Sequence, residues 1–305
     1  TVIVKGQDII TLANDSIKLE FLDEKSGFGL NSLLNLLTKH EFLLGQAPTG
    51  NLWEIRFKHT SNQVIAIDNT IACDKAHNIE KSADGNSTIL NLHWRGIALE
   101  EENNVVDVHA SVRIDKSFSY WQINVECRSE EYGLWEIIYP VIRGIKASEE
   151  ENVRLACPNK LGLILRDPVH QMPVELFYPS FRATMQFSTL FEEKNNSGLY
   201  FATYDPDAYT KKSEYSVDQE NISIRYDLKN YPDGMGVFGS SYQMPYEAVI
   251  GVYHGDWITA SKIYRQWALK QKWCSKGMLK KRKDIPVWFL NTPVWFAGTP
   301  SENMI

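Results

Sequence analysis

The chain has 305 residues, 43% of them hydrophobic and 23% charged, which is the profile of a soluble globular protein. Its net charge of −6 gives no electrostatic reason to expect binding to nucleic acid or to an anionic membrane, and no apolar run is long enough to span a bilayer. Nine tryptophans and fourteen tyrosines suit either a thick β core or a surface that faces sugars.

From residue 9 to about residue 253, apolar and polar residues alternate in short runs separated by turn-forming residues. Such alternation predicts strands that bury one face and leave the other in water. Many antiparallel strands joined by short turns predict an all-β fold, a large antiparallel β-sandwich. The alternating apolar positions are Ile17, Leu19 and Phe21; Trp53, Ile55 and Phe57; Leu90, Leu92 and Trp94; Val106, Val108, Ala110, Val112 and Ile114; Trp121, Ile123, Val125 and Cys127; and Ile222, Ile224, Tyr226 and Leu228.

Two segments interrupt this alternation. Residues 30–37 are compatible with a helical turn or a bulged strand, and we favour the strand. Residues 158–179 contain four prolines, which disfavour central strands, so we expect a long ordered surface loop there.

The only helix that the pattern clearly predicts covers residues 257–272. Asp256 precedes it as a good N-cap, because its carboxylate can accept the free amide hydrogens of the first turn. The apolar residues at helical spacing form one stripe, which we expect to dock on the sandwich. They are Trp257, Ala260, Ile263, Tyr264, Trp267 and Ala268.

The last apolar run, residues 286–296, reads as a strand. Only nine residues follow Phe296, so whatever element this strand would begin is expected to lie outside the chain.

Several segments together resemble a family of bacterial glycoside hydrolases. Residues 178–179 (Tyr-Pro), 184–187 (Thr-Met-Gln-Phe) and 198–205 (Gly-Leu-Tyr-Phe-Ala-Thr-Tyr-Asp) resemble a signature of proteins with a galactose mutarotase-like β-supersandwich before a (β/α)8 barrel. Residues 255–257, 263–268 and 273–274 resemble the helix that links these two modules. Residues 14–22, 27–34 and 51–53 resemble the opening strands of mutarotase-like domains. The family identified by this resemblance has the DUF6259 domain, and its distant relatives include the endo-α-N-acetylgalactosaminidase group.

The resemblance implies three parts: a β-supersandwich over residues 1–254, a linker helix and basic linker over 255–285, and a first barrel strand over 286–305. It also implies a bacterial protein that is periplasmic, on the cell surface or secreted. A barrel needs about 250 residues and places its active site at the ends of its strands. The chain therefore resembles the accessory module, with the catalytic barrel as its missing partner.

We predict no catalytic residue in this chain. The runs of glutamate at 100–102 and 149–151 are typical of solvated loops. His93 and His109 alternate with buried positions and are expected on the wet face of a sheet, although an epimerase would need such a histidine beside a carboxylate.

The chain also gives no reason to expect a metal or another cofactor. Four cysteines, Cys73, Cys127, Cys157 and Cys274, are widely spaced without the pattern of a zinc site. We expect Cys127 to be a buried free thiol, and one disulfide in the chain remains open.

Carbohydrate binding requires exposed aromatic rings beside polar side chains. The best candidates are Tyr178, Phe181 and Arg182, at the end of the proline-rich segment and directly after it, followed by Trp135 and Tyr139. The aromatic residues Trp257, Tyr264, Trp267 and Trp273 are predicted to form the interdomain linker contacts.

Three functions follow from the sequence. The first is a non-catalytic, carbohydrate-associated module that supports a catalytic barrel or lends a loop to its substrate cleft. The second is a free-standing sugar-active enzyme, either an aldose epimerase or a glycosidase. The third is a carbohydrate-binding module.

Overall fold

The computed structural model describes residues 9–45, 51–83, 85–147, 152–219 and 221–293. The chain forms two compact units, Thr1–Tyr264 and Arg265–Ile305. The division that we predicted at residues 254 and 285 concerns roles in a longer protein and stays a prediction.

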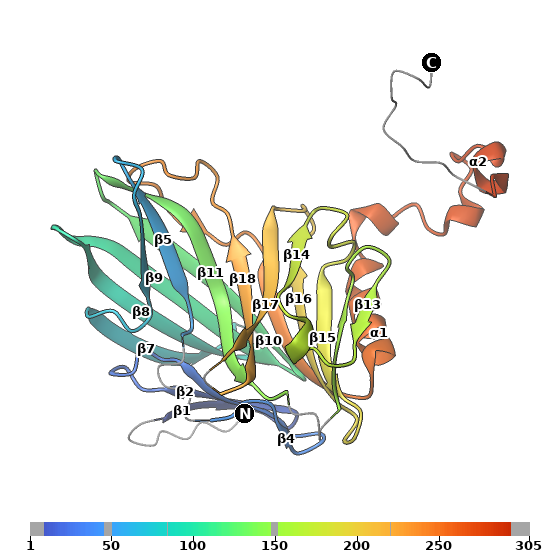
Figure 1. Ribbon diagram of the computed structural model, residues 1–305, viewed down its shortest axis with the longest axis horizontal. Helices are drawn as coiled ribbons and strands as arrows, with labels where there is room; N and C mark the ends of the chain where they lie inside the picture. Colours follow the sequence, from blue (N-terminus) through green and yellow to red (C-terminus); the bar gives the residue numbers. More distant parts are fainter. Residues whose placement is uncertain (1–8, 46–50, 84, 148–151, 220, 294–305) are drawn as a thin grey trace. The chain divides into compact units, whose positions relative to one another are not determined.

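Two large antiparallel sheets dominate the described part of the first unit (Figure 1). The ten-stranded sheet contains, in spatial order, β13 (Leu163–Leu165), β12 (Val153–Cys157), β15 (Phe187–Glu192), β16 (Ser197–Tyr204), β20 (Glu247–His254), β10 (Phe118–Cys127), β9 (Glu102–Asp115), β8 (Thr88–Leu99) and β7 (Asp74–Lys81), with β19 (Tyr242–Gln243) paired to β10. The six-stranded sheet contains β14 (Val174–Tyr178), β17 (Lys211–Asp218), β18 (Ser223–Asn230), β11 (Tyr132–Ile145), β5 (Glu54–His59) and β6 (Val64–Asp68).

Aromatic rings fill the space between these two sheets. Trp121 on β10 packs against Tyr139 on β11 with ring centroids 6.0 Å apart, and Phe201 on β16 stacks on Tyr226 of β18 at 4.3 Å. All four side chains are at most 2% exposed. Burying a large apolar side chain contributes about 2 kcal/mol, so this layer is a main source of stability. The alternation predicted from the sequence is thus confirmed as the inner face of a sandwich.

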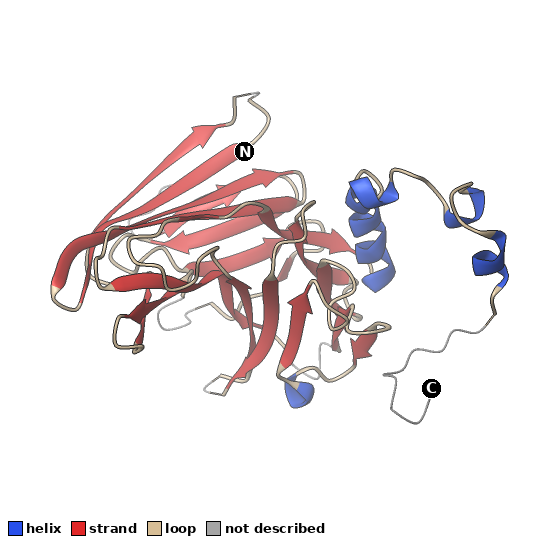
Figure 2. Cartoon of the chain, turned by 90° about the horizontal axis from the view of Figure 1, so that it is seen from above, coloured by secondary structure: helices blue, strands red, loops and turns tan. Residues whose placement is uncertain are grey.

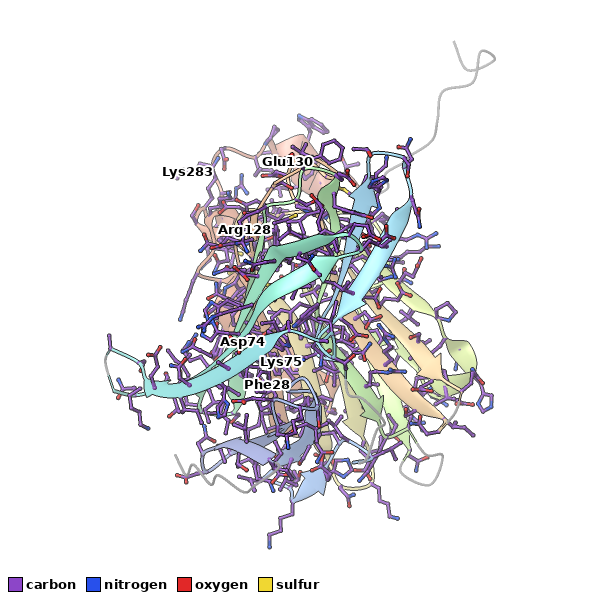
Figure 3. The ribbon with its side chains drawn as sticks, turned by 90° about the vertical axis from the view of Figure 1, so that its left-hand side faces the viewer. Phe28, Asp74, Lys75, Arg128, Glu130 and Lys283 are labelled. Carbon is purple, nitrogen blue, oxygen red and sulfur yellow. The ribbon has the colours of Figure 1, made fainter. Side chains whose placement is uncertain are left out.

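A third sheet contains β1 (Ile9–Ala13), β2 (Ile17–Leu22), β3 (Leu30–Asn35) and β4 (His40–Glu41) and lies across one end of the sandwich (Figure 1). Phe28, which follows β2, packs edge-on against Trp94 at 5.3 Å and lies beside the start of β7 (Figure 3). Asn35 donates hydrogen bonds to Ser197 Oγ at 3.1 Å and to the Tyr253 carbonyl at 3.0 Å. These contacts fix the small sheet to the ten-stranded one.

The strands predicted within residues 9–253 match strands of the structure, and Figure 2 shows that the sandwich consists mainly of strands joined by loops. Residues 30–35 form β3, with an irregular register against β2, as we favoured over a helical turn. The prediction for Ile222 was wrong: it precedes β18 with φ +49° and is 66% exposed, because the turn before the strand has a left-handed residue there. Cys127 is a buried free thiol, and the other three cysteines are also free.

The proline-rich segment is more regular than we expected. Residues 158–179 include β13, the short 3-10 helix η2 (Val169–Gln171) and β14. The prediction of a long surface loop was therefore wrong in part. Both strands lie at a sheet edge, and all four prolines of the segment lie outside them, so no proline interrupts the strand pairing.

The helix α1 spans Trp257–Ala268 and is shorter than the predicted 257–272. The backbone N–H groups of Ile258 and Thr259 donate to Asp256 Oδ1 at 3.0 and 3.3 Å, which confirms the predicted N-cap. Tyr264 stacks on Phe187 of β15 at 4.8 Å, so the first part of the helix docks on the outer face of the ten-stranded sheet.

The second unit includes the end of α1, two 3-10 turns, η3 (Lys272–Cys274) and η4 (Leu279–Lys281), and a short helix α2 (Val287–Asn291). Residues 287–291 therefore contradict the predicted strand. A strand without a neighbour leaves its backbone groups unpaired, whereas a helical turn pairs its own, as in the Phe289 N–H bond to the Pro286 carbonyl at 3.0 Å. Residues 294–296 of the same prediction lie outside the described residues.

Candidate functional site

The predicted loop cluster lies at the end of β14, at the edge of the six-stranded sheet. Phe181 is 67% exposed and Arg182 is also exposed, while Tyr178 is half-buried. Ser180 Oγ donates to the Phe177 carbonyl and accepts the Arg182 N–H at 3.0 Å, which shapes the turn. The structure thus brings Tyr178, Phe181 and Arg182 onto one short segment, with one aromatic ring open to solvent.

A buried ion pair lies directly behind this loop. The Lys211 ammonium contacts the Asp205 carboxylate, and both side chains are almost fully buried. Lys211 Nζ also lies 4.8 Å from the ring centroid of Tyr178 and 4.3 Å from that of Tyr246. Asp205 accepts three backbone N–H bonds, of which the shortest is 2.7 Å from Tyr209. This carboxylate is therefore held by one turn of the chain as well as by the lysine.

Burial lowers the pKa of Lys211 to about 8, although the neighbouring Asp205 acts in the opposite direction. Gln186 links the pair to the sheet: its Oε1 accepts from Thr203 Oγ1 at 3.0 Å, and its Nε2 donates to the Asp205 carbonyl at 2.8 Å. The cavity beside these groups has a volume of about 20 Å³, room for one water molecule. A sugar does not fit there, so the ion pair supports the loop from behind.

The two residues of the second predicted pair differ in exposure. Tyr139 is fully buried between the two large sheets, so its prediction as a carbohydrate contact was wrong. It lies on β11, where most side chains on both faces are buried, and sequence alternation does not reveal this. Trp135 is partly exposed, with Lys58 Nζ 4.8 Å from its ring centroid. Its cationic neighbour Lys58 comes from β5, so Trp135 is not part of the cluster formed by Tyr178, Phe181 and Arg182.

The outer face of the ten-stranded sheet holds a pair of histidines. His93 on β8 and His109 on β9 are directly opposite each other, and their rings stack at 4.5 Å. Burial is the main reason why the pKa values of both are lowered. His109 Nε2 lies 3.3 Å from Asn91 Oδ1. On the same face, Arg113 pairs with Glu247 at 2.8 Å.

Two hollows that we did not predict flank Trp257 at the start of α1. One is apolar, with a volume of about 260 Å³, and its walls include Leu163, Met185 and Phe187. The other is polar, with a volume of about 460 Å³, and its walls include Arg154 and Arg166. Trp257 and Ile164 line both hollows. The sequence contained one indication of this site: Trp257 directly follows the N-cap residue Asp256, so a large aromatic side chain lies at the exposed start of the helix.

The predicted linker aromatics separate into two groups. Trp257 is 41% exposed and Tyr264 is buried in the first unit. Trp267 and Trp273 lie in the second unit, where their rings pack at 5.7 Å. Their predicted role between modules stays a prediction.

Among the described residues, no group of three or more histidines, cysteines and acids is placed to hold a metal ion. Across the same residues, no helix is both long and apolar enough to cross a membrane.

Comparison with solved structures defines the class of fold. A galactose mutarotase-like protein from Clostridium acetobutylicum matches with a TM-score of 0.51 at 10% identity, over 80% of this chain and 94% of that one. The GH36 α-galactosidase AgaB from Geobacillus stearothermophilus matches with a TM-score of 0.57 at 10% identity, over 89% of this chain and 43% of that one. The galactosidase domain of AgaSK, an α-galactosidase-sucrose kinase, gives 0.54 at 10% identity, over 83% and 42%. The protein is a galactose mutarotase-like β-supersandwich, as predicted.

Sequence comparison identifies the more specific resemblance. Residues 242–305 match the family DUF6259, described as a domain of unknown function, which confirms the resemblance predicted for the end of the chain. A protein from Monosiga brevicollis named "Putative glycoside hydrolase 22789" is 32% identical over 122 residues, which cover 37% of this chain and 10% of that protein. The chain thus spans about a tenth of the length of this curated relative.

Proposed function

We propose that this chain is a non-catalytic, carbohydrate-associated module of a glycoside hydrolase, which supports a catalytic barrel or contributes the loop after β14 to its substrate cleft. One observation carries the proposal: polar residues of the signature segments are buried and form hydrogen bonds within the protein. Gln186, Thr203 and Asp205 all come from these segments, and all are buried and bonded to neighbouring strands or turns. Side chains that are buried and hydrogen-bonded inside the protein are not accessible to a substrate.

The comparisons support a modular arrangement. The matched α-galactosidases share this fold over 42% to 43% of their length, and the curated relative is named as a glycoside hydrolase. The carbohydrate association and the missing barrel are therefore proposals about the longer protein. A periplasmic, cell-surface or secreted location, which the family resemblance implies, belongs to the same proposal.

The decisive assay is turnover of a panel of aryl glycosides by the purified 305-residue chain. We expect no turnover above the buffer rate. Turnover that one substitution of a partly exposed acid abolishes, such as Glu247→Gln on the outer sheet face, would contradict the proposal. Lys262→Ala on the exposed side of α1 is the matched control, since it lies outside every cluster described above.

A second candidate function, an aldose epimerase, is favoured by the stacked His93 and His109. General base catalysis needs a neutral imidazole, and the lowered pKa values provide it. The hydrogen-bond partner of His109 is the Asn91 amide, however, and an epimerase would need a carboxylate at the same point. Polarimetry of freshly dissolved galactose and glucose decides the matter. Accelerated mutarotation that is lost in His109→Ala would establish this function, and an unchanged rate would exclude it.

A further inference from the structure

The larger of the two hollows beside Trp257 has the dimensions of a ligand site. We call the hollow of about 460 Å³ the polar hollow and the hollow of about 260 Å³ the apolar hollow. Ligand sites commonly have volumes of roughly 300–1,000 Å³, and the polar hollow lies within this range. Trp257 forms a wall of both, and its indole is 41% exposed although it begins a helix whose next turns are docked on the sheet.

The acids around the polar hollow already have partners. Glu192 is buried against His40, with Oε2 and Nδ1 3.0 Å apart, and it also accepts from Asn195. Glu193 pairs with Arg154 at 3.2 Å. The Asp256 carboxylate caps α1, so the helix N-terminus is occupied by the chain itself.

One strong donor in the polar hollow is left for a ligand. Arg166 is exposed, and within the described residues its guanidinium has no hydrogen-bond or ion-pair partner. Its carbonyl accepts a hydrogen bond from Arg154, which ties the segment in place. A guanidinium has five N–H donors in a fixed plane and suits neighbouring oxygen acceptors. The hollow therefore combines a partly exposed tryptophan with a guanidinium that has no partner among the described residues.

We infer that this site binds one pyranosyl residue of a glycan, with its C–H face on Trp257 and its ring hydroxyls accepting from Arg166. Both requirements of sugar recognition, an aromatic ring and a planar group of hydrogen-bond donors, are among the residues that line this hollow. A protein partner is a poorer fit, because the core of a protein interface is depleted of charged residues and this hollow contains two arginines and three acids. The inference deepens the proposed function and rests on it.

Saturation-transfer NMR tests the site with the complete chain. The probes are the methyl α-pyranosides of galactose, glucose, mannose and N-acetylgalactosamine. We expect at least one of them to bind, and we expect binding to weaken about tenfold in Trp257→Ala and in Arg166→Ala. Trp257→Tyr retains an aromatic face and is expected to keep most of the affinity. Unchanged melting temperatures of the variants will show that lost binding reflects the site and not unfolding.

Phe181→Ala is the control that separates this inference from the proposed function, because Phe181 is the exposed ring of the other candidate cluster. Binding that is lost in Phe181→Ala and unchanged in Trp257→Ala overturns the site and leaves a carbohydrate-associated module in place. No binding of any probe by the unsubstituted chain also overturns the site. The proposed function fails only on a different result, catalytic turnover that depends on a single acid.

Discussion

At the scale of single residues, two histidines on the outer face of the ten-stranded sheet make the stability of the protein depend on pH. His93 and His109 stack face to face, and burial lowers the pKa of each below the ordinary value of 6.5. The charges that face them are Arg95, which lowers the pKa of His93, and Glu80, which raises that of His109. The net direction for both histidines is downward, so the folded protein favours two neutral rings.

This arrangement predicts loss of stability in mild acid. Below pH 6.5 the unfolded histidines take up protons before the folded ones do, so the free energy of unfolding falls until the folded rings also protonate. Urea unfolding across this range is expected to show a smaller fall in His93→Asn/His109→Asn than in the parent chain. The exposed His254 provides the control, His254→Asn. Equal slopes in all three proteins would contradict the prediction.

Because residue 198 is a glycine, the Tyr253 ring lies closer to its backbone than any side chain at this position would allow. A Cβ atom there would lie 1.9 Å from the Tyr253 ring, whose hydroxyl is held by Thr189 Oγ1 at 2.7 Å. We expect Gly198→Ala to lower the free energy of unfolding by about 2 kcal/mol, because an overpacked core must shift. Adding Tyr253→Leu should recover part of the loss. Denaturant unfolding measures both effects. An unchanged free energy of unfolding in Gly198→Ala would contradict the prediction and show that the Tyr253 ring moves aside without cost.

At the scale of elements, the N-cap of α1 is the clearest local determinant. Asp256→Ala removes the acceptor for two first-turn N–H groups and is expected to cost about 1 kcal/mol. Asp256→Asn keeps an acceptor oxygen and should lose much less. Thermal and urea unfolding provide the comparison, and equal losses in both variants would mean that charge, not capping, stabilises the helix.

The elements also show what sequence patterns reveal. Period-two alternation located the buried faces correctly where one face is wet, as in β8 and β9. It failed for Tyr139 on β11, because that strand is covered on both faces and its polar positions are few. The capping residue Asp256 was predicted from its local chemistry alone. The hollows beside Trp257 combine residues from four separate segments, and such tertiary proximity leaves no local pattern.

At the scale of the whole molecule, apolar side chains gather on α2. Val287 and Trp288 are 70% and 64% exposed, and Phe289 and Leu290 are also exposed. Exposed apolar patches of this kind promote association. We expect the chain to self-associate with rising concentration and a double variant, Trp288→Ser/Leu290→Ser, to do so less. Size-exclusion chromatography with light scattering checks this, with Phe181→Ser as a control elsewhere. A monomer at all concentrations would contradict the prediction.

Behind the β14 loop, Asp205 from the signature segments and its partner Lys211 stabilise the fold. Lys211→Met leaves the Asp205 carboxylate buried without its counter-ion, which typically costs about 3–5 kcal/mol. Lys211→Met/Asp205→Asn should recover much of this loss. Lys212→Met on the same strand is the matched control, because its pairs with Glu175 and Glu214 are partly exposed and it should lose only about 1 kcal/mol.

Urea unfolding of these variants, with glycan binding measured alongside, is the most direct test. We expect a large loss of stability in Lys211→Met and unchanged glycan affinity in the fraction that remains folded. A Lys211→Met protein that is as stable as the parent chain, but no longer binds glycan or has lost an activity, would contradict it.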